Sequence, residues 1–102
     1  MIELNEKNFK REVLKEKNLP VLVDFYANWC EPCRMQTPIL SSFAKNNADK
    51  IKVYKINIDN ALGIANDYSV TSIPTLLLFN NGLVTKKVVG LQDEKNLFQL
   101  LQ

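Results

Sequence analysis

The sequence predicts one α/β domain, spanning residues 1–102, with a mixed β-sheet and helices on both faces. First, a chain of 102 residues is the size of a single domain. Second, the nearly continuous apolar run PVLVDFYA, residues 20–27, is typical of a strand covered on both sides. Third, strand and helix patterns alternate until residues 74–90, where two strand patterns follow one another. Parallel strands joined by helices and then a hairpin imply a mixed sheet.

The composition is that of an ordinary soluble protein, with 46% hydrophobic and 24% charged residues. The net charge is only +2 and the basic residues are dispersed, so no nucleic-acid or lipid partner is expected. Residues 1–18 mix charges without an apolar leader core, and no run approaches the roughly 18 apolar residues of a membrane span. We therefore expect a cytoplasmic protein, unless a leader has been removed, and a monomer, because no second apolar face is evident.

The N-terminal segment, residues 4–18, has the pattern of a helix. Asn5 is a suitable N-cap, and three apolar residues recur on one face: Phe9, Val13 and Leu14. The residues before Asn5 suit a strand or a loop. The strand of residues 20–27 follows.

A second helix is predicted from Pro32 to about Asn47. Its apolar positions recur at helical spacing: Met35, Ile39, Leu40 and Phe43. Pro38 interrupts this pattern, and because proline removes a backbone hydrogen bond we expect a kink there.

The second half of the chain continues the alternation. KIKVYKINID, residues 50–59, predicts a central strand, and residues 61–69 predict a short helix weakened by Gly63. PTLLLF, NNG and LVTKKVVG, residues 74–90, predict a hairpin, since Asn and Gly tolerate the positive φ of tight turns. Residues 93–102 predict a last helix capped by Asp93, with these leucines facing inward: Leu97, Leu100 and Leu101.

The only two cysteines, Cys30 and Cys33, are three positions apart, and the chain has no histidine. A tetrahedral zinc site would need two further nitrogen or sulfur ligands, so no metal is expected. Two interpretations remain: a pair of unrelated buried thiols, or a dithiol redox couple.

The position of the cysteines favours the redox couple, because they lie where a strand ends and a helix begins. The first turn of a helix offers unpaired N–H groups and a positive dipole end, which stabilise a thiolate. Pro32 suits that first turn. We expect Cys30, at the helix tip, to attack a substrate disulfide and Cys33, one turn further, to displace the product.

Asp24 is unusual because it lies inside the apolar strand. Burial disfavours an ionised carboxylate and raises its pKa toward neutrality, which suits a group that moves protons to and from Cys33. Alternatively, the strand twists and Asp24 reaches solvent or accepts a backbone N–H.

Three separated segments resemble the signatures of the thioredoxin family in the same order: DFYANWCEPCRMQTPIL, SIPTLLLFNNG and VVG. The resemblance implies the thioredoxin fold, a five-stranded mixed central sheet flanked by four helices. It also implies general protein-disulfide reductase activity on client proteins, with a redox-active Cys30–Cys33 disulfide and no bound cofactor. Electrons would come from NADPH through a thioredoxin reductase, a flavoprotein.

The resemblance also assigns residues around the cysteines. Lys55 would lie near Asp24, although a solvated strand lysine is an equal alternative. An X–Pro bond is cis in only about 5–6% of cases, so the residues alone favour trans at Pro74; the resemblance implies cis, facing the cysteines. The backbone of Ile73 would then pair with an extended substrate strand.

A docking surface is implied next to the cysteines. Trp29 alone would usually be core packing, but by resemblance it forms a partly exposed edge of this surface. Gly90 would allow close backbone approach. The remaining members are Ile58, Ser72, Ile73 and Val89, with core packing as the alternative for Ile58 and Val89.

Glu31 departs from the family, in which most members have glycine between the first cysteine and the proline. Its negative charge beside Cys30 predicts a less acidic nucleophile and a more strongly reducing couple. The tetrapeptide CEPC also resembles that of membrane-tethered reductases of cytochrome c maturation, whose leader and insertions are missing from this sequence. A redox-inert docking module is a third possibility, but it would not need Asp24, Pro32 and both cysteines.

Overall fold

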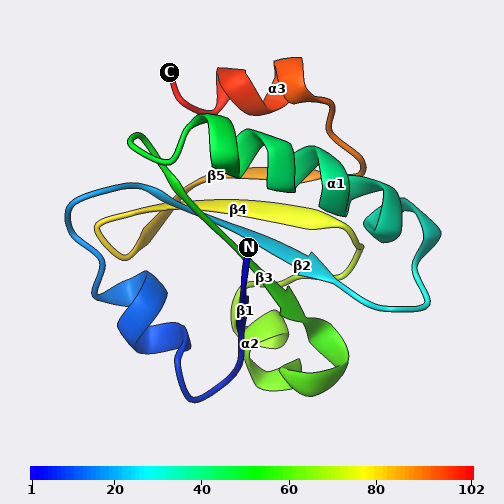
Figure 1. Ribbon diagram of the computed structural model, residues 1–102. Coiled ribbons are helices and arrows are strands. Elements are labelled where there is room, and N and C mark those ends of the chain that lie inside the picture. The colour runs from blue at the N-terminus through cyan, green and yellow to red at the C-terminus, as the bar shows by residue number, and fades with distance from the viewer.

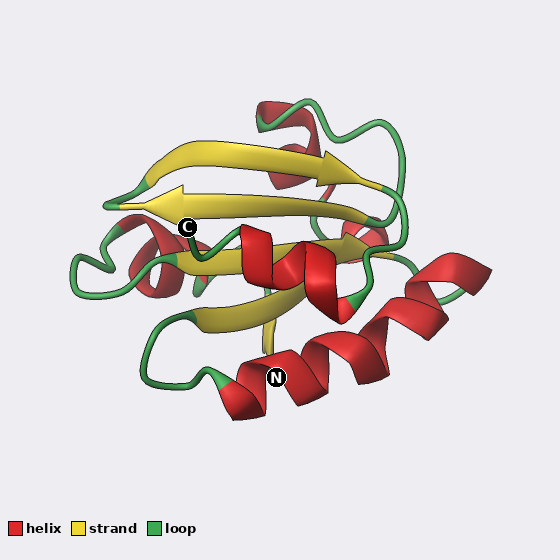
Figure 2. Ribbon diagram, turned by 90° about the horizontal axis from the view of Figure 1, so that it is seen from above, coloured by secondary structure: helices red, strands yellow, loops and turns green.

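The computed structural model describes residues 1–102 and contains one five-stranded mixed sheet in the order β1-β3-β2-β4-β5. β1, β3 and β2 are parallel, whereas β4 is antiparallel to β2 and β5 is antiparallel to β4. Figure 2 shows that β4 runs in the opposite direction to its two neighbours, β2 and β5. The strands are β1 (Ile2–Leu4), β2 (Val21–Tyr26), β3 (Lys52–Asn57), β4 (Thr75–Asn80) and β5 (Leu83–Val89). The predicted α/β architecture with a mixed sheet is confirmed.

Helices cover both faces of this sheet. α1 and α3 lie on one face, and η1 and α2 lie on the other (Figure 1). The helical segments are η1 (Lys10–Leu14), α1 (Glu31–Asn46), η2 (Ile58–Asn60), α2 (Leu62–Asp67) and α3 (Glu94–Gln99). None of them is long and apolar enough to cross a membrane.

The alternation of side chains along β2 divides the core into two layers. Val23 and Phe25 pack toward η1 and α2, while Leu22 packs toward α1 and α3. Asp24 lies on the α1 side, because successive strand residues point to opposite faces. The one charged side chain of β2 is therefore directed toward the helix that carries the cysteines.

The N-terminal helix prediction is partly wrong. The Asn5 side chain accepts hydrogen bonds from the N–H groups of Lys7 and Asn8, at 2.8 and 2.9 Å, as expected of a cap. However, the regular helical part is only the short π-helix η1. Ile2–Leu4 is a strand paired with β3, which is one of the two possibilities expected for the residues before Asn5. The carboxylate of Glu16 accepts the N–H groups of the residues that follow, which ends the helix early.

The long helix α1 begins at Glu31 and runs through Pro38 without a break. The ring therefore does not end the helix, and the expected kink stays a prediction. Of the four apolar positions that recur at helical spacing, Met35 is 52% exposed, whereas the polar Gln36 beside it is buried. The Gln36 side chain is satisfied there, since it donates to the carbonyl of Gln92 and accepts its N–H.

The remaining boundaries follow local hydrogen bonds. The second predicted strand stops at Asn57, whose side chain accepts the N–H of Asp59 and starts the 3-10 turn η2. The hairpin is confirmed, with positive φ at Asn81 and Gly82 (53° and 81°). The Asp93 cap is also confirmed, because its carboxylate accepts the N–H of Asn96 at 2.8 Å.

Candidate active site

Cys30 and Cys33 lie at the junction of β2 and α1 and form a disulfide, with Cα atoms 5.2 Å apart. Cys30 is the N-cap of α1, and its Sγ accepts a hydrogen bond from the N–H of Cys33 at 3.3 Å. In the reduced protein, the same N–H and the helix dipole would stabilise a thiolate on Cys30. The pair is therefore a disulfide-forming couple rather than two unrelated thiols.

The two sulfurs differ in access in the expected order. Cys30 is 6% exposed and Cys33 is 1% exposed. The prediction that Cys30 is the more exposed of the two is confirmed, although both residues are largely buried in the oxidised form. Ala27 and the partly buried side chains of Ile58 and Ile73 pack against the pair.

The loop before β4 lies directly against the cysteines. The Ile73–Pro74 peptide bond is cis, as the family resemblance predicted. The Sγ of Cys30 is 3.8 Å from the carbonyl oxygen of Ile73, which is a van der Waals contact while the sulfur is in the disulfide. The N–H of Gly90 donates to the carbonyl of Pro74 at 2.8 Å, which joins the end of β5 to the same loop.

Asp24 is completely buried, and neither of its carboxylate oxygens has a hydrogen-bond partner in the protein. The alternative that it reaches solvent or binds a backbone N–H is therefore wrong. Burial raises the pKa of Asp24 to about 7, against an opposing effect of the Lys55 ammonium and with a further increase from the Glu3 carboxylate. A carboxyl group with such a pKa can both donate and accept a proton near neutral pH.

Lys55 occupies the β3 position in register with Asp24. It also lines a hollow of about 260 Å³ together with Cys33 and Tyr26. The structure thus brings Asp24, Lys55 and Cys33 to one side of the sheet. Lys55 also contacts a carboxylate that the sequence did not suggest, because its Nζ is 3.9 Å from Glu3 Oε1.

The predicted docking residues differ in exposure, and two of them, Ile58 and Ile73, pack against the cysteines. Trp29 is 67% exposed and Val89 is 54% exposed, so core packing is wrong for both. Ser72 is exposed, whereas Ile58 and Ile73 are half-buried. The indole N–H of Trp29 donates to Asp59 Oδ2 at 2.9 Å, a contact that orients the ring and that sequence reasoning missed.

Gly90 has a positive φ of 93°, a backbone conformation that favours glycine over other residues. Crowding by neighbouring atoms is not the reason for a glycine here. No atom of the protein lies within 4 Å of the position that a Cβ would take. The expected close backbone approach therefore has no counterpart within the chain itself, and the space beside Gly90 is open.

Glu31 is paired with Arg34, one turn further along α1. The Arg34 guanidinium also donates to the carbonyl of Asn28 at 2.8 Å. Arg34 therefore offsets part of the negative charge that Glu31 places beside Cys30. The spacing of three residues on a helix is a known signal for such a pair, and sequence reasoning could have used it.

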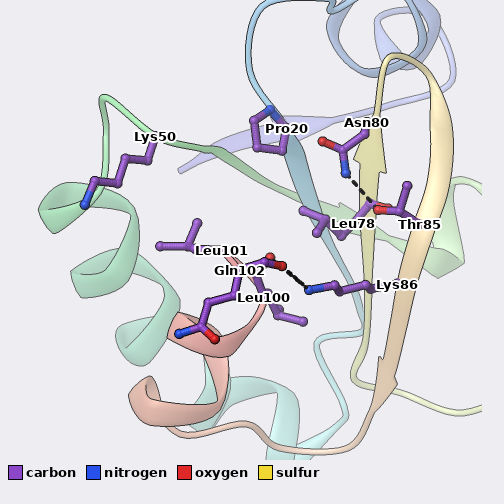
Figure 3. A pocket seen from close by; sticks show the side chains of 9 residues that line it. All are labelled: Pro20, Lys50, Leu78, Asn80, Thr85, Lys86, Leu100, Leu101 and Gln102. Atoms are coloured by element: carbon purple, nitrogen blue, oxygen red, sulfur yellow. Dashed lines mark hydrogen bonds between the residues drawn. The ribbon is translucent and has the colours of Figure 1, made fainter.

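A second hollow, of about 340 Å³, lies at the opposite end of the sheet, where Pro20 precedes β2 and Asn80 ends β4 (Figure 3). It contains neither cysteine. Lys86 points into it and donates to the carbonyl of Gln102 at 2.9 Å, so this hollow is where the C-terminal segment is attached to β5.

A disulfide at a strand-to-helix turn, next to a cis-proline loop and with a buried carboxyl group on the same side of the sheet, defines the site of a thiol–disulfide oxidoreductase. The comparisons with known proteins agree with this class. The family model described as Thioredoxin matches residues 1–102. The chain belongs to the thioredoxin family.

Several curated relatives are similar over most of this chain. A protein named Thioredoxin from Rickettsia felis is 47% identical over 92% of this chain and 89% of its own. Another, named Thioredoxin from Alicyclobacillus acidocaldarius, is 43% identical over 92% of this chain and 88% of its own. Thioredoxin M-type, chloroplastic, from Spinacia oleracea is 44% identical over 86% of this chain but only 48% of its own length. Together with the disulfide, these relatives establish thiol–disulfide reductase activity.

Proposed function

We propose that this chain is a general protein-disulfide reductase of the cytoplasm that works as a monomer. Cys30 is the attacking thiolate and Cys33 the resolving thiol. The observation that carries this assignment is the N-cap position of Cys30, whose sulfur accepts the N–H of Cys33 and is the more exposed of the two. A helix N-terminus lowers the pKa of a cysteine placed there, which favours the nucleophilic form.

The reaction is a two-electron exchange of disulfide bonds. The Cys30 thiolate attacks one sulfur of a client disulfide, which forms a mixed disulfide and releases the first client thiolate. Cys33 then gives up its proton and attacks the Cys30 sulfur. This step forms the Cys30–Cys33 disulfide and releases the second client thiolate, so the client is reduced and the cysteine pair is oxidised.

Asp24 is the proton acceptor for Cys33 in this scheme, and Lys55 modulates it. A buried carboxyl group with a pKa of about 7 is partly ionised at neutral pH and can take up the proton of the resolving thiol. We infer that a water relays the proton, because Cys33 lines a hollow of about 260 Å³ that is large enough for a water and that also contains Lys55, the neighbour of Asp24 on β3.

Client proteins bind across the loop that contains Ile73 and cis-Pro74. The backbone of Ile73 adjoins Cys30, so an extended client segment that pairs with it would bring its disulfide to the attacking sulfur. The docking surface consists of Trp29, Ile58, Ser72, Ile73, Val89 and Gly90. Apolar contacts of this modest extent suit transient binding of many different clients.

The oxidised pair is reduced again by a thioredoxin reductase, a flavoprotein that takes electrons from NADPH. No cofactor needs to be bound to this chain, because the cysteines carry both electrons. NADPH oxidation in the presence of the cognate reductase and a disulfide-containing protein tests the proposal. We expect turnover with the native chain and none with Cys30→Ser or Cys33→Ser; turnover that persists in either variant would refute the assigned cysteine pair.

A further inference from the structure

Three charged side chains form a row across three neighbouring strands. Glu3 of β1 is in register with Lys55 of β3, and Lys55 is in register with Asp24 of β2. Residues in register on adjacent parallel strands point to the same face. The single ammonium group therefore lies between two carboxyl groups, a half-exposed outer one and a fully buried inner one.

The contacts of this row place Lys55 with the outer carboxylate. The Nζ of Lys55 is 3.9 Å from Glu3 Oε1 and 5.4 Å from the centroid of the Tyr26 ring. The hydroxyl of Tyr26 donates to the same Glu3 oxygen at 2.6 Å. Asp24, in contrast, accepts no hydrogen bond from Lys55 or from any other group of the protein.

We propose that Glu3 is a positioning residue for the resolving step: it holds Lys55 at the outer end of the row and so prevents it from forming an ion pair with Asp24. This inference rests on the proposed role of Asp24 as proton acceptor for Cys33. An Asp24 paired with Lys55 would stay ionised and be a weak base, whereas an unpaired Asp24 can take the proton of Cys33.

No other charged group faces Asp24 closely enough to replace Lys55. On the other side of β2, the partner in register is the apolar Leu76 of β4. From α1, Cys33 and Arg34 line the adjoining hollow, but the guanidinium of Arg34 is engaged by Glu31 and Asn28. The α3 residue buried on this face is the apolar Leu97.

The directions of the two charge effects on Asp24 agree with the proposal. The Lys55 ammonium lowers the pKa of Asp24, and the Glu3 carboxylate raises it.

The Glu3→Gln variant tests the proposal, because glutamine removes the charge and keeps an oxygen that can accept the Tyr26 hydroxyl. Glu3 and Asp24 are two strand spacings apart, ~10 Å, so loss of the Glu3 charge alone should lower the pKa of Asp24 by roughly 0.3 to 1.3, and an ion pair between Asp24 and the released Lys55 should lower it further. Carbon-13 NMR of the Asp24 carboxyl group, followed through a pH titration of the oxidised protein, measures this change. Glu6→Gln, an exposed carboxylate in the turn after β1, is the matched control and should leave the pKa of Asp24 where it is. An Asp24 pKa that is unchanged or higher in Glu3→Gln would overturn the proposal.

A second measurement follows the resolving step itself. When reduced protein is mixed with the disulfide of thionitrobenzoate, Cys30 forms a mixed disulfide and releases one coloured thiolate, and the attack of Cys33 on Cys30 then releases a second. Stopped-flow absorbance gives the rate of this second release at each pH. In Glu3→Gln the rise of this rate with pH should move to lower pH by the same amount as the pKa of Asp24. If the pKa falls but the rate profile does not move, Glu3 does not act on the resolving step and the proposal fails. The pH dependence of the same rate in Asp24→Asn then separates the role of Glu3 from the role of Asp24. If this pH dependence also matches that of the native protein, the proposed role of Asp24 as proton acceptor has failed as well.

Discussion

Asp24 affects both stability and chemistry, because the burial of its carboxyl group destabilises the folded protein and also suits it to proton transfer. It is completely buried, without a hydrogen-bond partner, in the middle of an otherwise apolar strand. The sequence predicted this burial correctly from the apolar residues on either side of it. It could not predict Glu3, which is 21 positions away and reaches the site only through the pairing of β1 with β3.

Asp24→Asn should stabilise the protein in a pH-dependent way. The pKa of Asp24 is 3.8 when unperturbed and about 7 in the folded protein, so well below pH 4 both states are protonated and burial carries no ionic cost. As the pH rises through 4 toward 7, the unfolded state ionises first, and the free energy of unfolding falls until the folded carboxyl group also ionises. Above pH 7 the variant should therefore be more stable by about 2–4 kcal/mol, and at pH 4 most of this gain should be lost.

Urea unfolding of the oxidised protein at pH 4 and pH 8 checks this prediction. Asp49→Asn, which changes an exposed aspartate near the end of α1, is the control and should show no comparable gain. An Asp24→Asn variant that is equally stable relative to native at both pH values would contradict the burial effect.

Glu31 and Arg34 should act in opposite directions on Cys30. The negative charge of Glu31 disfavours a thiolate beside it, but its ion pair with Arg34 and its exposure reduce the effect. Titration of thiolate absorbance in the reduced protein should show a slightly more acidic Cys30 in Glu31→Gly and a less acidic one in Arg34→Gln. A Cys30 pKa that is unchanged or higher in Glu31→Gly would disprove the charge effect.

At the scale of elements, turns and caps were predictable and contacts between elements were not. The NNG turn appeared as expected because Asn81 and Gly82 both adopt positive φ, a local requirement. The sequence did not indicate that this turn packs against η1, where a Cβ on Gly82 would lie 2.5 Å from the carbonyl oxygen of Leu14. In the same way, the strand character of residues 2–4 comes from pairing with β3 and has no local signal.

Lys86→Met should weaken the attachment of α3 to β5. The Lys86 ammonium donates to the carbonyls of Gln99, Leu100 and Gln102 at 3.4, 3.4 and 2.9 Å, at the end of the helix, where the dipole also favours a positive charge. Methionine keeps the apolar stem and removes these bonds, so the free energy of unfolding should fall by about 1 kcal/mol. Chemical denaturation measures the loss, with the exposed Lys17→Met as the control; equal stabilities of the two variants would show that the contact contributes nothing.

At the scale of the molecule, the order of elements predicted the class of fold, and the family signatures supplied the strand number. Apolar strands that alternate with helices indicated parallel strands covered on both faces, and the two successive strand patterns of residues 74–90 indicated an antiparallel hairpin. Together they indicated a mixed sheet. The residues alone favoured a trans bond at Pro74, which is wrong, and they left the position of Lys55 open, because both features depend on how β3 and β4 are placed around β2. The active site therefore depends on how the whole sheet is assembled, although its two cysteines are close together in the sequence.

The central claim, that Cys30 attacks and Cys33 resolves, is tested most directly by trapping the mixed disulfide. Each single variant, in reduced form, is mixed with a disulfide-containing protein, and covalent adducts are identified by intact-protein mass spectrometry. We expect Cys33→Ser to accumulate an adduct through Cys30, because no second thiol is present to displace it, and Cys30→Ser to form almost none. Equal adducts in the two variants, or an adduct only through Cys33, would contradict the assignment.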